Sequence, residues 1–202
     1  MMRIFSKYTW RFFDTKKEIY LTFDDGPTPE ITQFVLSKLK DYKAKATFFC
    51  IGKNIKNHPE IFSEIISDGH SIGNHTQNHL NGWKSSNISY INDFLACENV
   101  ISSKVEKSQN INLFRPPYGK IKKSQAKEIL RKGYKIIMWD VLSADFDTTI
   151  SKEKCLQNVL ENTKNGSIIV FHDSVKAFEK LEFALPKVLK TFSEKGFVFK
   201  AI

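Results

Sequence analysis

The sequence is poor in cysteine, and its cysteines form no pattern. The three that occur are far apart and include no CxxC pair, which excludes a disulfide framework and a thiolate metal site. They stand in apolar surroundings, so we expect them to be small buried residues. They are Cys50, Cys97 and Cys155.

The sequence also has no long apolar run. None reaches the ~20 residues that a membrane-spanning helix needs, so we expect no integral membrane segment. The first residues are basic but lack the apolar core and small-residue cleavage site of a secretory signal. On the sequence alone, this predicts a cytoplasmic chain.

Arginine is scarce, although the chain is basic. Lys+Arg is 31 and Asp+Glu is 22, which gives a formal charge of +9, yet only four of the cations are arginines. Recognition of phosphates and base edges favours the forked arginine side chain, so we do not expect a nucleic-acid partner. The lysine excess is compatible with attraction to an anionic surface such as a cell wall.

The sequence has the length of one globular domain, and it alternates between apolar strand-like segments and amphipathic helical segments. The 202 residues are 41 % apolar, with no repeat and no linker. Strands are expected at 19–23, 46–51, 71–74, 111–114, 134–139, 167–171 and 197–200. Helices are expected at 29–39, 59–68, 88–105, 124–132, 153–162 and 178–195. This alternation predicts an α/β fold, a distorted barrel of about seven parallel strands, with an open doubly wound sheet as the alternative. We expect a monomer with an N-terminal extension at 1–17 and the domain at 18–202.

Polar side chains follow five of the predicted strands. They are Asp24 with Asp25, His75, Arg115, Asp140 and His172. In a parallel barrel the carboxyl ends of all strands lie on one face, which is the face that carries chemistry. Solvated turns explain any one of these residues but not the coincidence of all five.

The segment HTQNH, residues 75–79, predicts a metal site together with the acidic pair. His75 and His79 stand at i and i+4, a spacing that lets two imidazoles point the same way on a helical turn. One carboxylate of Asp24 or Asp25 would complete a site with open positions, suited to zinc, with cobalt or nickel as alternatives. The other carboxylate would handle protons. The alternative is that the pair only caps the turn before Thr28.

Two further residues have two interpretations each. His172 ends the apolar run SIIVF, and it is either a hydrogen-bonded core residue or a general acid or base in a cleft. Arg115 begins the rigid stretch RPPYG, which can aim the arginine at a carboxylate or present backbone N–H groups to an oxyanion. A simple ion pair at the barrel rim is the alternative for Arg115.

These segments together resemble the polysaccharide deacetylase family, the NodB-homology carbohydrate esterases. TFDDGP (22–27), HTQNH (75–79) and RPPYG (115–119) match the first three motifs of that family in order and spacing. WDVLSADF (139–146) and VFH (170–172) resemble the fourth and fifth. The resemblance covers residues 18–202.

The resemblance implies a metal-dependent hydrolase that removes acetyl groups from N-acetylated sugars. It assigns the metal to Asp25, His75 and His79, the catalytic base to Asp24 and the general acid to His172. It further implies that Arg115 orients Asp24 and that the Tyr118 backbone N–H helps to hold the oxyanion. Because the family often works on cell envelopes, that compartment is a second expectation beside the cytoplasm.

The fourth motif departs from the family pattern. Leu142 takes the place of the first aspartate, and Phe146 that of the tryptophan, while Val170 replaces leucine in the fifth motif. The aspartate that tunes the catalytic histidine is therefore expected to be Asp145, with Asp140 as the alternative. An altered pKa of His172 is the expected consequence.

The polymer is not given by the sequence. Chitin oligomers, peptidoglycan and exopolysaccharides all carry N-acetyl groups, and an O-acetyl group on xylan is an alternative substrate. A sugar-binding barrel without catalysis is a second class of function. A phosphoesterase is a third, but it would need ligands for two metal ions.

Overall fold

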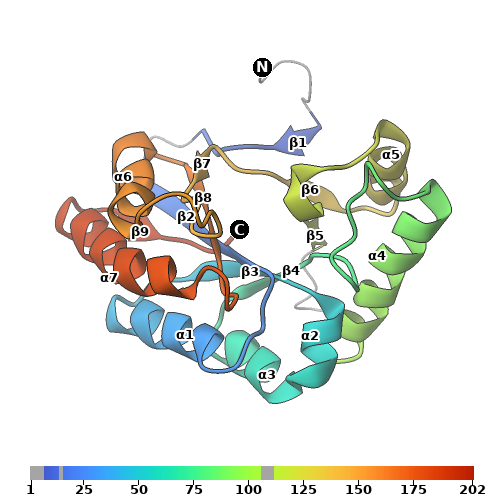
Figure 1. Ribbon diagram of the computed structural model, residues 1–202, viewed down its shortest axis with the longest axis horizontal. Coiled ribbons are helices and arrows are strands. Elements are labelled where there is room, and N and C mark those ends of the chain that lie inside the picture. The colour runs from blue at the N-terminus through green and yellow to red at the C-terminus, as the bar shows by residue number, and fades with distance from the viewer. Residues whose placement is uncertain (1–6, 14–15, 106–111) are drawn as a thin grey trace.

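The computed structural model describes residues 7–13, 16–105 and 112–202. In this part of the chain nine strands form one sheet, with helices outside it (Figure 1). The strands are β1 (Tyr8–Thr9), β2 (Glu18–Asp24), β3 (Ala46–Cys50), β4 (Ser71–Asn74), β5 (Leu113–Phe114), β6 (Lys135–Ile137), β7 (Val141–Leu142), β8 (Ile168–His172) and β9 (Val198–Phe199). The helices are α1 (Ile31–Asp41), α2 (Gly52–Asn57), α3 (Pro59–Ser67), α4 (Asn87–Ser102), α5 (Lys123–Arg131), α6 (Lys152–Asn162) and α7 (Phe178–Glu194), with a 3₁₀ turn, η3, at Pro117–Gly119.

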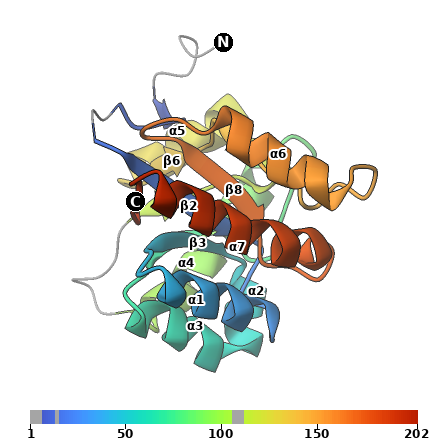
Figure 2. The same ribbon diagram turned by 90° about the vertical axis from the view of Figure 1, so that its left-hand side faces the viewer.

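The sheet is parallel and curled. Eight strands follow the order β1-β6-β5-β4-β3-β2-β8-β7, and β9 also pairs with β2. Every named pairing is parallel. The helices surround the strands on three sides of the view in Figure 1, and Figure 2 shows α1, α6 and α7 covering β2, β3 and β8 from outside. This confirms the predicted α/β class and the distorted barrel.

Four short elements were not predicted: β1, β7, α2 and the 3₁₀ turn η3. β1 lies within residues 1–17, the predicted extension, and pairs with β6. Residues 1–6 and 14–15 of that range lie outside the described residues, so the domain boundary at 17 stays a prediction. The predicted strand 111–114 is β5, and its first residue also lies outside the described residues.

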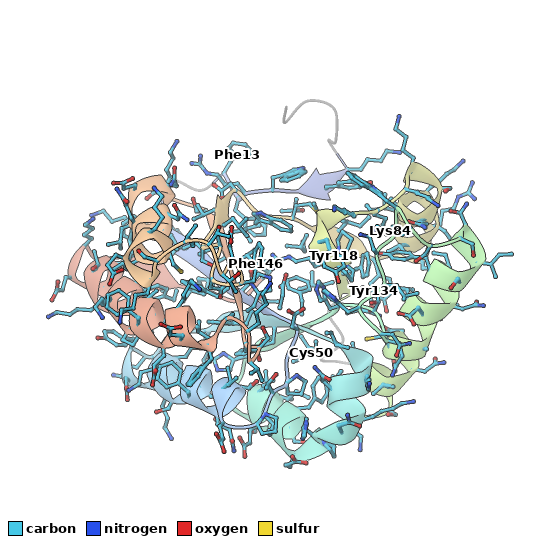
Figure 3. The ribbon with its side chains drawn as sticks, viewed as in Figure 1. Phe13, Cys50, Lys84, Tyr118, Tyr134 and Phe146 are labelled. Carbon is cyan, nitrogen blue, oxygen red and sulfur yellow. The ribbon has the colours of Figure 1, made fainter. Side chains whose placement is uncertain are left out.

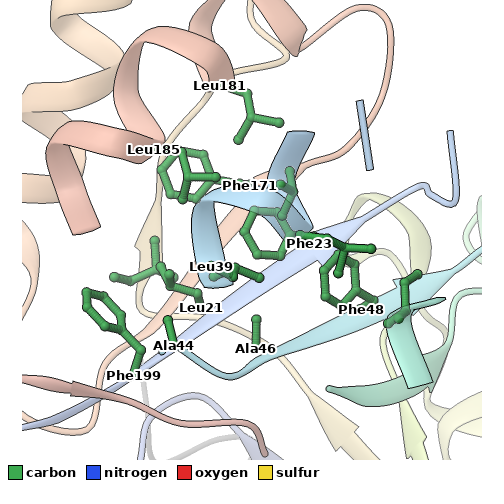
Figure 4. Close-up of a cluster of buried hydrophobic side chains, with 14 of the residues drawn as sticks. Leu21, Phe23, Leu39, Ala44, Ala46, Phe48, Phe171, Leu181, Leu185 and Phe199 are labelled. Carbon is green, nitrogen blue, oxygen red and sulfur yellow. The ribbon is translucent and has the colours of Figure 1, made fainter. Parts of the chain in front are cut away.

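The two faces of β2 have different surroundings. Leu21 and Phe23 point toward the helices, where Phe23 stacks on Phe48 of β3 at 5.1 Å between ring centroids. Figure 4 shows these side chains with Leu181 and Leu185 of α7. Each such buried side chain stabilises the fold by ~1.5–3 kcal/mol. Since neighbouring residues of a strand face opposite ways, Thr22 and Asp24 point into the barrel.

The predicted strand 134–139 is longer than the observed strand, and the place expected for Asp140 was wrong. β6, which lies between β1 and β5, ends at Ile137. The chain then crosses to the far edge of the sheet, where β7 pairs with β8. Asp140 therefore precedes a strand, and its carboxylate accepts hydrogen bonds from the Ile168 backbone N–H (2.8 Å) and the Ser167 hydroxyl (2.9 Å) at the amino end of β8. The apolar run continues through the crossing, so its pattern does not reveal the change of strand.

No helix among the described residues has both the length and the apolar character that crossing a bilayer requires.

Candidate active site

The turn after β2 fixes Asp24 and Asp25 through their backbone. Asp25 has a positive φ of 83°, and its carbonyl accepts a hydrogen bond from the Asn54 side chain at 2.7 Å. The Gly26 N–H donates to the Asp173 carboxylate at 3.0 Å. A Cβ on Gly26 would lie 1.9 Å from an Asp173 oxygen, so only glycine fits here. The two carboxylates are thus held at one strand end with different directions.

Arg115 holds Asp24 inside the barrel. The Arg115 side chain is fully buried, and its Nη1 donates to Asp24 Oδ1 at 2.7 Å and to the Thr22 hydroxyl at 2.6 Å. Its remaining donors reach the carbonyls of Ile137 (3.2 Å) and Met138 (3.0 Å). Burial raises the pKa of Asp24, but the Arg115 charge, the nearby His75 and His172 and the Arg115 hydrogen bond together outweigh it, so that the pKa lies below its usual value. Asp24 is therefore ionised at neutral pH.

The HTQNH segment is a loop after β4, and the expectation of a helical turn was wrong. Thr76 and His79 have positive φ values of 67° and 56°, which bend the chain so that both imidazoles face Asp25. Asp93 of α4 holds the loop between them: its carboxylate accepts hydrogen bonds from the Asn78 backbone N–H (3.0 Å) and side chain (2.6 Å). Tertiary hydrogen bonds, rather than helical periodicity, bring the two histidines together.

Asp25, His75 and His79 fit a divalent metal ion. One ligand-type atom from each lies within 4.8 Å of the other two. His75 Nδ1 lies 2.8 Å from the Arg115 carbonyl oxygen and donates to it, which leaves a lone pair on Nε2. His75 Nε2 is 3.6 Å from Asp25 Oδ1, and His79 Nε2 is 3.2 Å from the same oxygen. Asp25 Oδ1 is buried without a hydrogen-bond partner among the described residues.

The protonation of His75 agrees with a ligand role. Burial lowers its pKa to about 4, although Asp24 and Asp25 act in the opposite direction. The ring is therefore neutral at pH 7, the form in which imidazole binds metals. A buried carboxylate oxygen facing an imidazole lone pair is unfavourable unless a cation lies between them.

His172 lies at the end of β8, beside Asp24 in the sheet register. Its Nδ1 is 2.7 Å from Asp145 Oδ1, and its backbone N–H donates to Asp145 Oδ2 at 2.7 Å. Burial lowers the pKa of His172, but the Asp145 charge and hydrogen bond outweigh it and raise the pKa to about 9. Of the two aspartates expected as its partner, Asp145 contacts His172 and Asp140 lies at the opposite end of β8.

A pocket of about 490 Å³ opens between these groups. Tyr118, which has a positive φ of 59°, and Phe146 both line it, and Figure 3 shows them near the centre of the view. The Tyr118 ring packs on His79 with centroids 4.5 Å apart, and the Phe146 ring packs edge-on to His172 at 5.0 Å. The pocket is lined by Asp24, Asp25, His75, His79, Tyr118, Lys120, Trp139, Leu142, Phe146, Val170, His172 and Lys176.

Three residues of the site were missed by sequence reasoning. Asn54 lies on α2, a helix that the sequence did not predict, and Asp93 lies among ordinary polar residues of α4. No local pattern distinguishes either one. Asp173 could have been found, because a buried carboxylate directly after an apolar strand and His172 is unusual. Burial raises its pKa to about 8, despite a hydrogen bond from Thr32 at 2.6 Å.

Comparison with known proteins agrees with this geometry. The sequence model of the polysaccharide deacetylase family matches residues 14–137. A peptidoglycan-N-acetylglucosamine deacetylase of Bacillus cereus is 34 % identical over 195 residues, covering 96 % of this chain and 90 % of that protein. A chitooligosaccharide deacetylase of Azorhizobium caulinodans is 33 % identical over 166 residues, covering 81 % and 77 %.

A solved structure extends the agreement to three dimensions. The peptidoglycan N-acetylglucosamine deacetylase Bc1960, in complex with 4-naphthalen-1-yl-N-oxidanyl-benzamide, superposes with a TM-score of 0.90 at 33 % identity. The match covers 97 % of this chain and 91 % of that one. The chain therefore belongs to the polysaccharide deacetylase family.

Proposed function

We propose that this chain hydrolyses the acetamide of N-acetylglucosamine residues in a polysaccharide or oligosaccharide, with one divalent metal ion. The observation that carries the proposal is the convergence of Asp25, His75 and His79 around a buried, unpartnered carboxylate oxygen beside the ionised Asp24. Relatives named as peptidoglycan and chitooligosaccharide deacetylases support this substrate class. Peptidoglycan is a cell-wall polymer, which favours the cell envelope as the place of action.

Asp25, His75 and His79 would hold the ion, and two imidazoles with one carboxylate favour Zn²⁺, with Co²⁺ or Ni²⁺ as alternatives. Bound there, a divalent ion would supply Lewis acidity, which lowers the pKa of a water molecule and polarises a carbonyl group.

Asp24 and His172 have the opposite protonation states that amide hydrolysis requires. The pKa of Asp24 is lowered and that of His172 is raised to about 9, so at neutral pH one is an ionised base and the other a charged acid. Asp24 would accept the proton of the attacking water. His172 would donate a proton to the leaving amine, and the Tyr118 N–H would stabilise the oxyanion.

Arg115 and Asp145 would act through these two groups. Arg115 fixes the direction of the Asp24 carboxylate with its 2.7 Å hydrogen bond. Asp145 accepts a hydrogen bond from His172 Nδ1–H, so that Nε2–H is the group left to donate a proton to the leaving amine. The pocket wall beside them contains Leu142, Val170 and Phe146.

The test is acetate release from N-acetylglucosamine oligomers and peptidoglycan fragments. We expect release by metal-loaded protein, loss with a chelator, and recovery when zinc, cobalt or nickel is added back. Acetate from acetylated xylan alone would favour the O-deacetylase alternative. Oligomer binding without release under any metal would favour a sugar-binding barrel.

A further inference from the structure

An exposed aromatic ring stands beside the mouth of the pocket. Trp83 is 60 % exposed, and Tyr118, which lines the pocket, is 58 % exposed. Lys120 also lines the pocket, and its ammonium is 5.5 Å from the centroid of the Trp83 ring. The exposed indole is therefore joined, through Lys120, to the pocket that contains the predicted metal site.

Trp83 is held in place although it faces solvent. Its indole N–H donates to the Ile121 carbonyl at 3.2 Å, and its backbone N–H donates to the Asn81 side chain at 3.0 Å. The neighbouring Gly82 donates to the Lys120 carbonyl at 3.1 Å, so close that a Cβ on Gly82 would lie 2.5 Å from that oxygen. The turn is thus packed against residues 120–121, and its indole is positioned before any ligand arrives.

Lys120 places a positive charge at this surface without neutralising it. Within the described residues Lys120 has no carboxylate partner. Lys176, in the loop between β8 and α7, lines the same pocket and adds a second ammonium. A neutral glycan could only accept hydrogen bonds from these ammonium groups, whereas an acidic one would also be attracted by their charge.

We propose that Trp83 and Lys120 form a subsite for the sugar next to the one deacetylated, and that this sugar carries a carboxylate. The proposal rests on the proposed function. The apolar face of the pyranose ring would lie on the indole, and the carboxylate would pair with the Lys120 ammonium. This explains why an anchored indole and an unpaired lysine lie together at the pocket mouth.

The experiment uses one tetrasaccharide in two forms. The acid form alternates N-acetylglucosamine with a sugar that bears a lactyl carboxylate, and the neutral form is its methyl ester. Binding is measured by calorimetry and kcat/KM by acetate release, both at low and high salt. We expect the wild type to prefer the acid form by about fivefold at low salt, mainly through KM, and to lose the preference at high salt.

Variants separate charge from stacking. Lys120→Gln should bring the two forms to equal kcat/KM, and Lys120→Arg should keep the preference. Trp83→Ala should weaken the binding of the acid form and of the neutral form equally, by about fivefold to tenfold. Lys84→Gln is the matched control, because Lys84 is an exposed lysine of the same turn that does not line the pocket, and Figure 3 labels it on the side of α4 and α5.

Two results would overturn the subsite: equal wild-type values for both forms, or a preference that survives Lys120→Gln. Preferential binding of the acid form without acetate release would instead contradict the proposed function and leave the subsite standing.

Discussion

At the scale of single residues, the buried pair of Arg115 and Asp24 makes the site sensitive to one charge. Arg115 is fully buried and spends four donors on fixed partners. Asp24 is the carboxylate among those partners. A buried cation without its counter-charge strongly destabilises a fold. Removing the Asp24 charge is therefore expected to lower the stability of the barrel as well as the activity.

Asp24→Asn is expected to lower kcat by ~10²–10⁴-fold while zinc still binds, because the amide cannot accept a proton. The variant should also lose about 3–5 kcal/mol of unfolding free energy, since Arg115 is left without a charge partner. Acetate release, zinc stoichiometry and thermal unfolding measure the three effects. Asp147→Asn is the control, because Asp147 does not line the pocket and its carboxylate accepts hydrogen bonds only from Thr149 among the described residues. Full activity with bound zinc would refute the base assignment.

Asp145→Asn tests the proposed role of His172 as the general acid. In the wild type the pKa of His172 is raised to about 9, so its charged form, and with it the activity, should persist to that pH and fall above it. Without the Asp145 charge the pKa should fall toward ~6.5, and the alkaline limb of the kcat profile should move to lower pH by the same amount. The contribution of this pair to stability is present below pH ~6.5 and lost as pH rises through 9. An unchanged alkaline limb would contradict the acid role of His172.

At the scale of elements, helix α4 controls a loop that it does not belong to. Asp93 holds Asn78, which lies between the two histidines, by two hydrogen bonds. The Asp93 carbonyl also accepts from the Gln77 N–H at 3.1 Å. The spacing of His75 and His79 therefore depends on a helix about 15 residues away in the sequence.

Asp93→Ala is accordingly expected to weaken zinc binding by ~10–100-fold, the effect typical of residues that position metal ligands. Calorimetric titration of metal-free protein with zinc measures it, and Asn92→Ala, at the exposed neighbouring position of α4, is the control. Unchanged zinc affinity in a folded Asp93→Ala protein would show that the loop keeps its shape unaided.

The sequence could predict those elements whose pattern of apolar and polar side chains is clear. β2, β3 and β8 are largely apolar runs, and β2 and β8 end in a polar residue. The structure brings Asp24 and His172 together with His75 and Arg115, which follow β4 and β5, at the carboxyl ends of the strands. It could not predict β7 or α2, because Val141 and Leu142 continue an apolar run and residues 52–57 have little apolar periodicity. Asp140 was misplaced for the same reason. The chemical roles of the site residues stay predictions.

At the scale of the whole molecule, metal binding should raise the stability of the fold. The three residues that would bind the ion come from the turn after β2 and from the loop after β4, and they can converge only in the folded chain. At a free zinc concentration 100 times the Kd, linkage stabilises the folded state by ~2.7 kcal/mol, which for a chain of this size raises Tm by ~5–10 °C. Calorimetric scans with zinc and with a chelator check this. Identical Tm values with zinc and with the chelator would argue against the metal site.

The expected monomeric state is a separate prediction, which light scattering would test.

β2 lies between β3 and β8, and its register on both sides has one consequence for how this protein can evolve. Sliding β2 by a single residue would rotate Phe23 into the cavity and turn Asp24 toward the helices. The same strand would then lose its alignment with the imidazole of His172 and with the loop that carries His75. Substitutions in the apolar layer under α1 and α7, remote from any reacting atom, are therefore constrained by chemistry as well as by packing.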